Sequence, residues 1–95
     1  MYVIRETFTA KPGMASKLAK MFKEMAAADP SMKGTRILTD AVGAYNTVVM
    51  EMETPSLAEF ENAMKEYAKN TDMKDKMKGY TDMYVSGKRE IFQVI

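Results

Sequence analysis

Few residue types in this chain can carry out acid–base, nucleophilic or metal chemistry. The 95 residues include no cysteine and no histidine, but they include 13 acidic side chains and five tyrosines. Without cysteine and histidine there is no disulfide, no thiolate nucleophile, no imidazole base and no histidine-bound zinc or haem. Proton transfer would therefore depend on carboxylates and phenols, and we expect no metal site and no cofactor.

Glu6 is the carboxylate that the sequence singles out as a catalytic candidate. It lies in the segment Tyr2–Ala10, whose alternating pattern is typical of a strand, and it shares one face with Ile4 and Phe8. A carboxylate that is partly removed from water by such neighbours can act as a general acid or base near neutral pH. The alternative is a structural glutamate at a cavity mouth, or one that is bonded to a tyrosine hydroxyl.

Three tyrosines are candidates for ligand binding because they fall on apolar stripes of helical spacing. They are Tyr67, Tyr80 and Tyr84. Their rings either pack in the core, with the hydroxyls reaching a partner or water, or they line a ligand cavity. Six of the 11 methionines also fall at helical spacing: Met14, Met21, Met25, Met64, Met73 and Met77. We interpret these six as core residues, which would make any neighbouring pocket pliable.

Two charged residues complete the list of ligand-binding candidates. Arg36 can hold an anionic ligand, and the alternative is an exposed strand residue. Glu90 has the same parity in the last strand as Glu6 has in the first, so it is a candidate neighbour of Glu6.

Hydrophobic periodicity predicts the elements that must position these side chains. Strands are expected at Tyr2–Ala10, Lys33–Asp40, Thr47–Glu53 and Lys88–Ile95. One helix is expected from Met14 to the Asp29-Pro30 break, and a second after Ser56, interrupted near Asn70 and resumed from Met73 to Tyr84, with Ser86-Gly87 as its stop. This order predicts a single domain, residues 1–95, with a ferredoxin-like α+β sandwich: an antiparallel sheet with its helices on one face.

The sheet face without helices is expected to carry apolar side chains. We assign to it Val3, Ile37, Val49, Ile91 and Ile95. Burying such residues contributes about 1.5 to 3 kcal/mol each, so the sequence predicts a homodimer that forms through this face. The predicted dimer-interface residues are Arg5, Val49, Glu51, Arg89 and Ile91. Arg5 and Arg89 would pair with Glu51 if the first strand lies between the third and fourth.

Composition argues against nucleic-acid and membrane partners. The net charge is +1, with both signs interspersed, so there is no basic footprint for a phosphate backbone. No apolar run approaches the ~18 residues of a membrane span, and the N-terminus has no signal-peptide core. We expect a cytoplasmic protein.

Several segments together resemble the dimeric α/β-barrel superfamily, and within it the antibiotic-biosynthesis-monooxygenase and NIPSNAP-like branch. They are Tyr2–Gly13, Gly43–Asn46, Thr47–Glu51, Ser56–Glu61 and Ser86–Phe92. The resemblance implies a ferredoxin-like subunit, a sheet-to-sheet dimer and a small-molecule cavity between sheet and helices. The haem-degrading members carry a histidine, a tryptophan and a first-strand asparagine. This chain has neither histidine nor tryptophan, and Glu6 stands where that asparagine would be, so the resemblance does not extend to haem degradation.

Three functions follow from these observations. The first is a dimeric domain that binds a small hydrophobic or aromatic molecule between sheet and helices. The second is a cofactor-independent monooxygenase or isomerase-like enzyme in which Glu6 transfers a proton and tyrosine hydroxyls orient the substrate. The third is a structural oligomerisation module. A ligand-sized cavity beside Glu6 distinguishes the first two from the third.

Overall fold

The first strand lies in the middle of the sheet. β1 (Tyr2–Ala10) pairs on one side with β3 (Thr47–Thr54) and on the other with β4 (Tyr84–Gln93), and β2 (Arg36–Thr39) pairs with the far edge of β3. The sheet has four strands in the order β2-β3-β1-β4, and every pair is antiparallel. The computed structural model describes all residues from 1 to 95. The predicted ferredoxin-like α+β architecture is confirmed.

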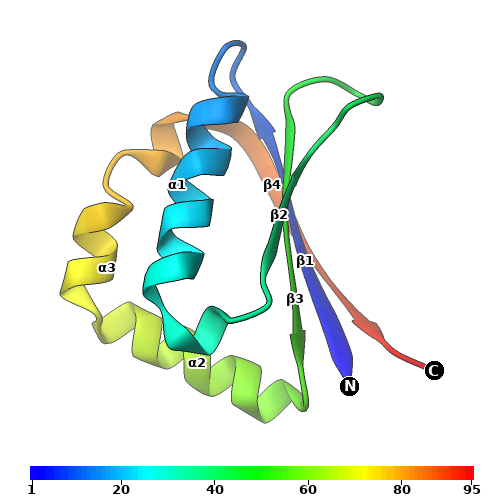
Figure 1. Ribbon diagram of the computed structural model, residues 1–95, viewed down its shortest axis with the longest axis vertical. Helices are drawn as coiled ribbons and strands as arrows, with labels where there is room; N and C mark the ends of the chain where they lie inside the picture. The colour runs from blue at the N-terminus through cyan, green and yellow to red at the C-terminus, as the bar shows by residue number, and fades with distance from the viewer.

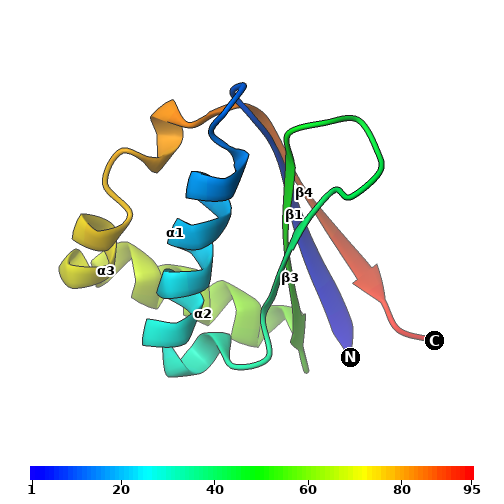
Figure 2. The ribbon, with the colours of Figure 1, turned by 45° about the horizontal axis from the view of Figure 1, so that its top comes forward.

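The helices form a second layer on one face of this sheet. Figure 1 shows α1 (Ala15–Ala28), α2 (Leu57–Lys69) and α3 (Thr71–Lys76) on the same side, and Figure 2 shows that the opposite face stays uncovered. Two single turns of 3-10 helix, η1 (Pro30–Met32) and η2 (Tyr80–Asp82), complete this layer. No helix is long and apolar enough to cross a bilayer.

Short polar side chains set the helix boundaries. The Ser56 hydroxyl accepts a hydrogen bond from the Glu59 N–H at 3.1 Å, which is the N-cap predicted for the second helix. The Asn70 side chain accepts from the Met73 N–H at 3.0 Å and starts α3 in the same way. The first helix ends at Asp29 because Pro30 follows and cannot continue the hydrogen-bond ladder.

The prediction of a helix that resumes as far as Tyr84 is wrong. α3 ends at Lys76, and Gly79, with φ +87°, turns the chain into η2. β4 then begins at Tyr84, four residues before the predicted strand. The pair Ser86-Gly87, interpreted as a helix stop, lies inside β4 because both residues pair with β1.

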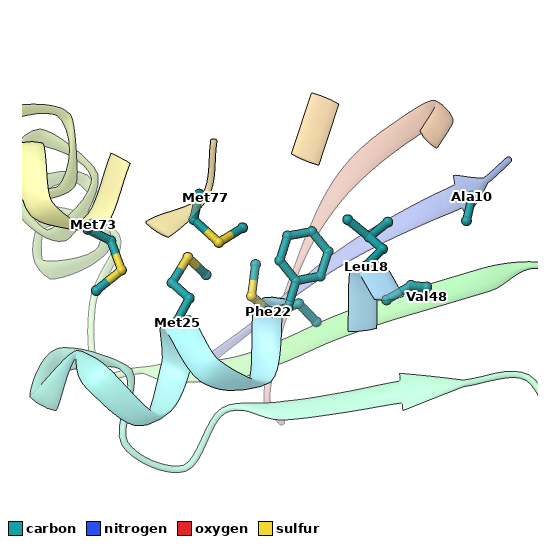
Figure 3. Packing of buried hydrophobic residues seen from close by; sticks show 8 residues of the cluster. Ala10, Leu18, Phe22, Met25, Val48, Met73 and Met77 are labelled. Carbon is teal, nitrogen blue, oxygen red and sulfur yellow. The ribbon is translucent and has the colours of Figure 1, made fainter. Parts of the chain in front are cut away.

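The core fills the space between α1 and the sheet. Leu18, Phe22, Ile4 and Val48 are fully buried there. Figure 3 shows the side chains of Met25, Met73 and Met77 pointing toward one another from α1 and from the α3 region. The interpretation of these three methionines as core residues is confirmed, whereas for Met64 it is wrong, since that residue is 38% exposed.

Strand register settles which residues share a face, since directly paired residues point the same way. For β1 and β3 the predicted assignment is correct: Arg5 pairs with Glu51, and Val49 pairs with Thr7, on the face without helices. We call this uncovered side the open sheet face. Its members include Val3, Arg5, Thr7, Arg36, Leu38, Val49, Glu51, Lys88, Glu90 and Phe92.

For β2 and β4 the predicted faces are wrong. Ile37 pairs with Met50, Ile91 pairs with Ile4 and Arg89 pairs with Glu6, so all three lie on the helix side. Each of these two strands carries apolar residues on both of its faces. The alternation of apolar and polar residues therefore could not show which face is turned toward the helices. The apolar residues that β2 and β4 place on the open sheet face are Leu38 and Phe92, which are 40% and 42% exposed.

Candidate functional site

A cleft of about 390 Å³ lies between the sheet and the helices. Nineteen residues line it and 13 of them are hydrophobic. We call it the helix–sheet cleft. Its lining includes Glu6 and the three predicted tyrosines, Tyr67, Tyr80 and Tyr84. Its volume falls within the range of small-molecule sites, about 300 to 1,000 Å³. A ligand-sized cavity, which is expected of a binding domain but not of a purely structural module, is therefore present beside Glu6.

A second hollow, of about 540 Å³, lies at the end of α1. Its lining includes Lys23, Gly34 and Thr35, and only four of its 10 lining residues are hydrophobic. None of the predicted catalytic or ligand-binding residues reaches it. Apolar lining with a few convergent polar groups is the mark of a ligand site, so the smaller helix–sheet cleft is the better candidate.

Four aromatic rings build one wall of the helix–sheet cleft. Phe8 contacts Phe22 and Tyr84 at ring-centroid distances of 5.0 and 4.9 Å. Tyr80 contacts the same two rings at 6.0 and 5.9 Å, which closes the circle. Each ring thus touches two others, from β1, α1, η2 and β4. Such pairs add about 0.5 to 1.5 kcal/mol each beyond burial, so the wall holds its two phenols in place.

Glu6 and Arg89 form an ion pair at the cleft. Both Nε and Nη2 of Arg89 contact Oε1 of Glu6, whose side chain is only 15% exposed. The guanidinium also lies over the ring of Phe60 in α2, with Cζ 5.2 Å from the ring centroid. The sequence reasoning missed this pair because it placed Arg89 on the opposite face. The residue types gave a signal, since the helix side of β4 offers one positive side chain near Glu6.

Two of the phenols at the cleft, those of Tyr67 and Tyr80, have a raised pKa. Burial raises the pKa of Tyr80, and the neighbouring Tyr84, Tyr67 and Glu6 raise it further. Burial also raises the pKa of Tyr67. None of the side-chain hydrogen bonds in the structure uses the hydroxyls of these tyrosines. The cleft therefore contains O–H donors that remain protonated at neutral pH and have no partner in the chain.

The other two ligand-binding candidates lie outside the helix–sheet cleft. Glu90 pairs with Arg5 across the open sheet face, so the expectation that it neighbours Glu6 is wrong. Its carboxylate lies 3.5 Å from Lys88 Nζ. Arg36 lies on the open sheet face and does not line the cleft. No group of three or more acidic side chains is arranged to hold a metal ion.

Glu51 is the centre of a small ionic cluster on the open sheet face. Its Oε1 accepts from Arg36 Nη2 at 2.6 Å and its Oε2 accepts from Arg5 Nε at 3.0 Å. The hydrogen bond from Arg36 has the largest effect on the pKa of Glu51 and lowers it, and the hydrogen bond from Arg5 lowers it further. The predicted contact between Arg5 and Glu51 is confirmed, as is the position of β1 between β3 and β4. The predicted contact of Arg89 with Glu51 is wrong, and Arg36 takes that place.

Solved structures of NIPSNAP proteins superpose on nearly the whole chain. A NIPSNAP family protein from Agrobacterium tumefaciens strain C58 matches with a TM-score of 0.85 at 14% identity, covering 97% of this chain and 90% of that one. An uncharacterised NIPSNAP domain protein from Burkholderia xenovorans matches with a TM-score of 0.82 at 12% identity, covering 100% and 95%. This chain shares the fold of these NIPSNAP proteins.

The same fold occurs in a protein described as a putative monooxygenase. A putative antibiotic biosynthesis monooxygenase from Chloroflexus aurantiacus matches with a TM-score of 0.75 at 12% identity, covering 99% of this chain and 92% of that one. The resemblance inferred from the sequence is thus confirmed at the level of fold. No protein-family model matches the chain, and no curated protein matches it. The shared fold gives the architecture and does not by itself assign a function.

Proposed function

We propose that the protein binds a small, neutral organic molecule, an aromatic or unsaturated ring with a hydroxyl or carbonyl group, in the helix–sheet cleft. The observation that carries this proposal is a set of polar side chains inside an otherwise apolar cleft. Tyr67, Tyr80 and Tyr84 offer hydroxyl donors, and Glu6 offers a carboxylate whose charge is balanced by Arg89. A few polar groups among apolar walls fix the orientation of a ligand, while the walls supply affinity.

The lining favours a flat ring over an aliphatic chain. Six methionines line the cleft together with its aromatic wall, and thioether sulfur makes favourable contacts with aromatic rings. These methionines are Met25, Met32, Met50, Met52, Met64 and Met77. Because Glu6 and Arg89 neutralise each other, this pair leaves no free positive charge for an anionic ligand. A neutral ligand that donates to Glu6 and accepts from a phenol needs no such charge.

Calorimetric titration with 1-naphthol tests this proposal. We expect saturable binding, weakened about three- to tenfold by Tyr80→Phe, because one hydrogen bond contributes about 0.5 to 1.5 kcal/mol. Tyr45→Phe is the matched control, since Tyr45 is 80% exposed on the β2–β3 loop. If neither Tyr80→Phe nor Tyr45→Phe changes the affinity for 1-naphthol, the helix–sheet cleft is not its binding site.

A second candidate is a cofactor-independent enzyme, favoured by the position of the Glu6 carboxylate near Tyr80. In that role Glu6 accepts a proton from a bound hydroxyl or activated C–H group, and the phenols stabilise the resulting anion. Turnover of quinols or β-dicarbonyl compounds, abolished by Glu6→Gln while 1-naphthol still binds, is the expected result. Turnover that survives Glu6→Gln would exclude this role.

We also propose that two copies associate through their open sheet faces. Leu38, Val49 and Phe92 supply the apolar part of this face, and Glu51 is already neutralised by Arg5 and Arg36 within one chain. The carboxylate of Glu51 can therefore be covered without being left unpaired. The guanidinium of Arg5 lies over the ring of Phe92 at 5.1 Å, which supports a face organised for contact rather than hydration.

A further inference from the structure

The ring of Phe8 lies where a side chain at position 87 would begin, and residue 87 is a glycine. The two residues face each other across β1 and β4, and both line the helix–sheet cleft. A Cβ added at Gly87 would lie 3.0 Å from Cδ1 and 3.2 Å from Cε1 of Phe8. Carbon atoms in contact prefer about 3.5 to 4.0 Å. The ring of Phe8 thus occupies space against β4 that a glycine leaves open.

The missing side chain, and not an unusual backbone conformation, is what this position requires. The glycines with positive φ are Gly13, Gly34 and Gly79, and Gly87 is not among them. Alanine at position 87 would keep the strand conformation but would push against the ring. The consequence of the substitution therefore depends on where Phe8 can go.

The neighbours of Phe8 leave it little freedom on the core side. Val48, its partner on β3, is fully buried, and the ring of Phe22 lies 5.0 Å away. Cores packed at this density do not yield space for a displaced ring. A side chain at position 87 would drive the Phe8 ring, and the Tyr84 ring 4.9 Å from it, toward the cleft.

We infer that Gly87 determines how large a ring system the helix–sheet cleft admits. The inference rests on the proposed binding function and deepens it by assigning the ligand class: fused-ring hydroxyl compounds, rather than single rings. Because residue 87 is a glycine, the Phe8 ring of the aromatic wall packs directly against β4, and the cleft keeps its full volume. Any larger residue narrows the cleft at that wall.

Binding of a graded series of neutral hydroxyl compounds tests this inference. The probes are phenol, 1-naphthol and 2-hydroxyanthracene, and the proteins are the parent chain and Gly87→Ala. We expect Gly87→Ala to weaken the hydroxyanthracene complex about tenfold or more and the phenol complex less than about twofold, because one methyl group in a pocket changes discrimination on that scale. Equal losses for all probes, or no loss, would overturn the inference.

The double variant Phe8→Leu, Gly87→Ala separates the steric mechanism from a general loss of stability. Leucine removes the ring that the alanine methyl group meets, so the double variant should recover hydroxyanthracene binding relative to Gly87→Ala. If Gly87→Ala alone fails to fold, folding of the double variant identifies the same clash. A double variant that binds no better than Gly87→Ala would count against it.

Crystal structures without ligand distinguish failure of this inference from failure of the proposed function. In Gly87→Ala we expect the Phe8 ring to be displaced toward the cleft and the cleft volume to fall below the parent's value of about 390 Å³. An unmoved ring and an unchanged cleft would overturn the role of Gly87. If the parent binds none of the three probes, the binding function fails, while these structures still decide what sets the cleft's size.

Discussion

Glu6 of β1 and Arg89 of β4 are cross-strand neighbours that form an ion pair on the helix side of the sheet. The guanidinium also lies over Phe60 of α2, so one side chain links two strands to the helix layer. This arrangement places a carboxylate inside an apolar cleft without leaving its charge unbalanced. It also fixes the orientation of the Glu6 carboxylate.

Removing Arg89 should destabilise the fold modestly. Arg89→Leu leaves the 15% exposed Glu6 carboxylate without its partner, but Arg89 itself is 43% exposed, so solvent screening limits the cost to about 1 kcal/mol. Urea denaturation measures this change, with Lys88→Leu as the control on the open sheet face. Adding Glu6→Gln to Arg89→Leu should recover part of the loss. A Glu6→Gln effect that is identical with and without Arg89 would show that the two side chains are not coupled.

Stability should fall at acid pH in a way that depends on Glu51. Its folded-state pKa is lowered by hydrogen bonds from Arg36 and Arg5, so below the ordinary glutamate value of about 4.3 the unfolded chain binds a proton that the folded chain does not. The stabilisation is complete above that value and is lost as the pH falls through the folded pKa. Denaturation midpoints between neutral and acid pH should therefore drop less for Glu51→Gln than for the parent. Parallel curves for the two proteins would contradict this prediction.

Tyr67 and Tyr80 should titrate above the ordinary pKa of tyrosine. Their folded-state pKa values are raised by burial, so above the ordinary value of about 10 the folded chain retains protons that the unfolded chain loses. Stability from this source is complete below pH of about 10 and is lost as the pH rises through the folded pKa values. Ultraviolet absorbance of phenolate should show a late phase that shrinks in Tyr67→Phe and Tyr80→Phe. A late phase that both variants keep in full would refute the assignment.

Association through the open sheet face should be sensitive to a charge at its centre. Val49→Asp places a carboxylate next to the Glu51 cluster, so sedimentation should change from twice the 10.7 kDa chain mass in the parent to the single-chain mass in the variant. Val42→Asp is the control, because Val42 is 98% exposed on the β2–β3 loop. A parent that sediments as a single chain at micromolar concentration would refute the dimer.

The sequence predicted the structure correctly where a residue pattern allowed only one interpretation. Alternation around Glu6 placed it correctly on the helix face of β1, because that face carries Ile4 and Phe8 while the other carries threonines and Arg5. The order of elements, with a serine cap before α2, then predicted the ferredoxin-like fold. Glu6 and the three tyrosines consequently reached the same cleft in the structure.

The sequence was insufficient where both faces of a strand look alike. In β4, Ile91 and Phe92 are equally apolar, and only the register with β1 shows that Ile91 faces the helices. This error moved Arg89 to the wrong face and hid its pair with Glu6. Gly87 was misread for a related reason: a glycine in a strand looks like a break until the ring that fills its space is known.

The methionine methyl groups give the most direct test of ligand binding in the helix–sheet cleft. The chain has 11 methionines, six of which line the cleft, whereas Met1, Met14, Met21, Met73 and Met83 do not. In an NMR titration of methyl-labelled protein with 1-naphthol, we expect saturable shifts at Met50, Met52, Met64 and their cleft neighbours, and constant positions for Met1, Met14, Met21 and Met83. Saturable shifts confined to the methionines outside the cleft, or none at any methionine, would contradict the account.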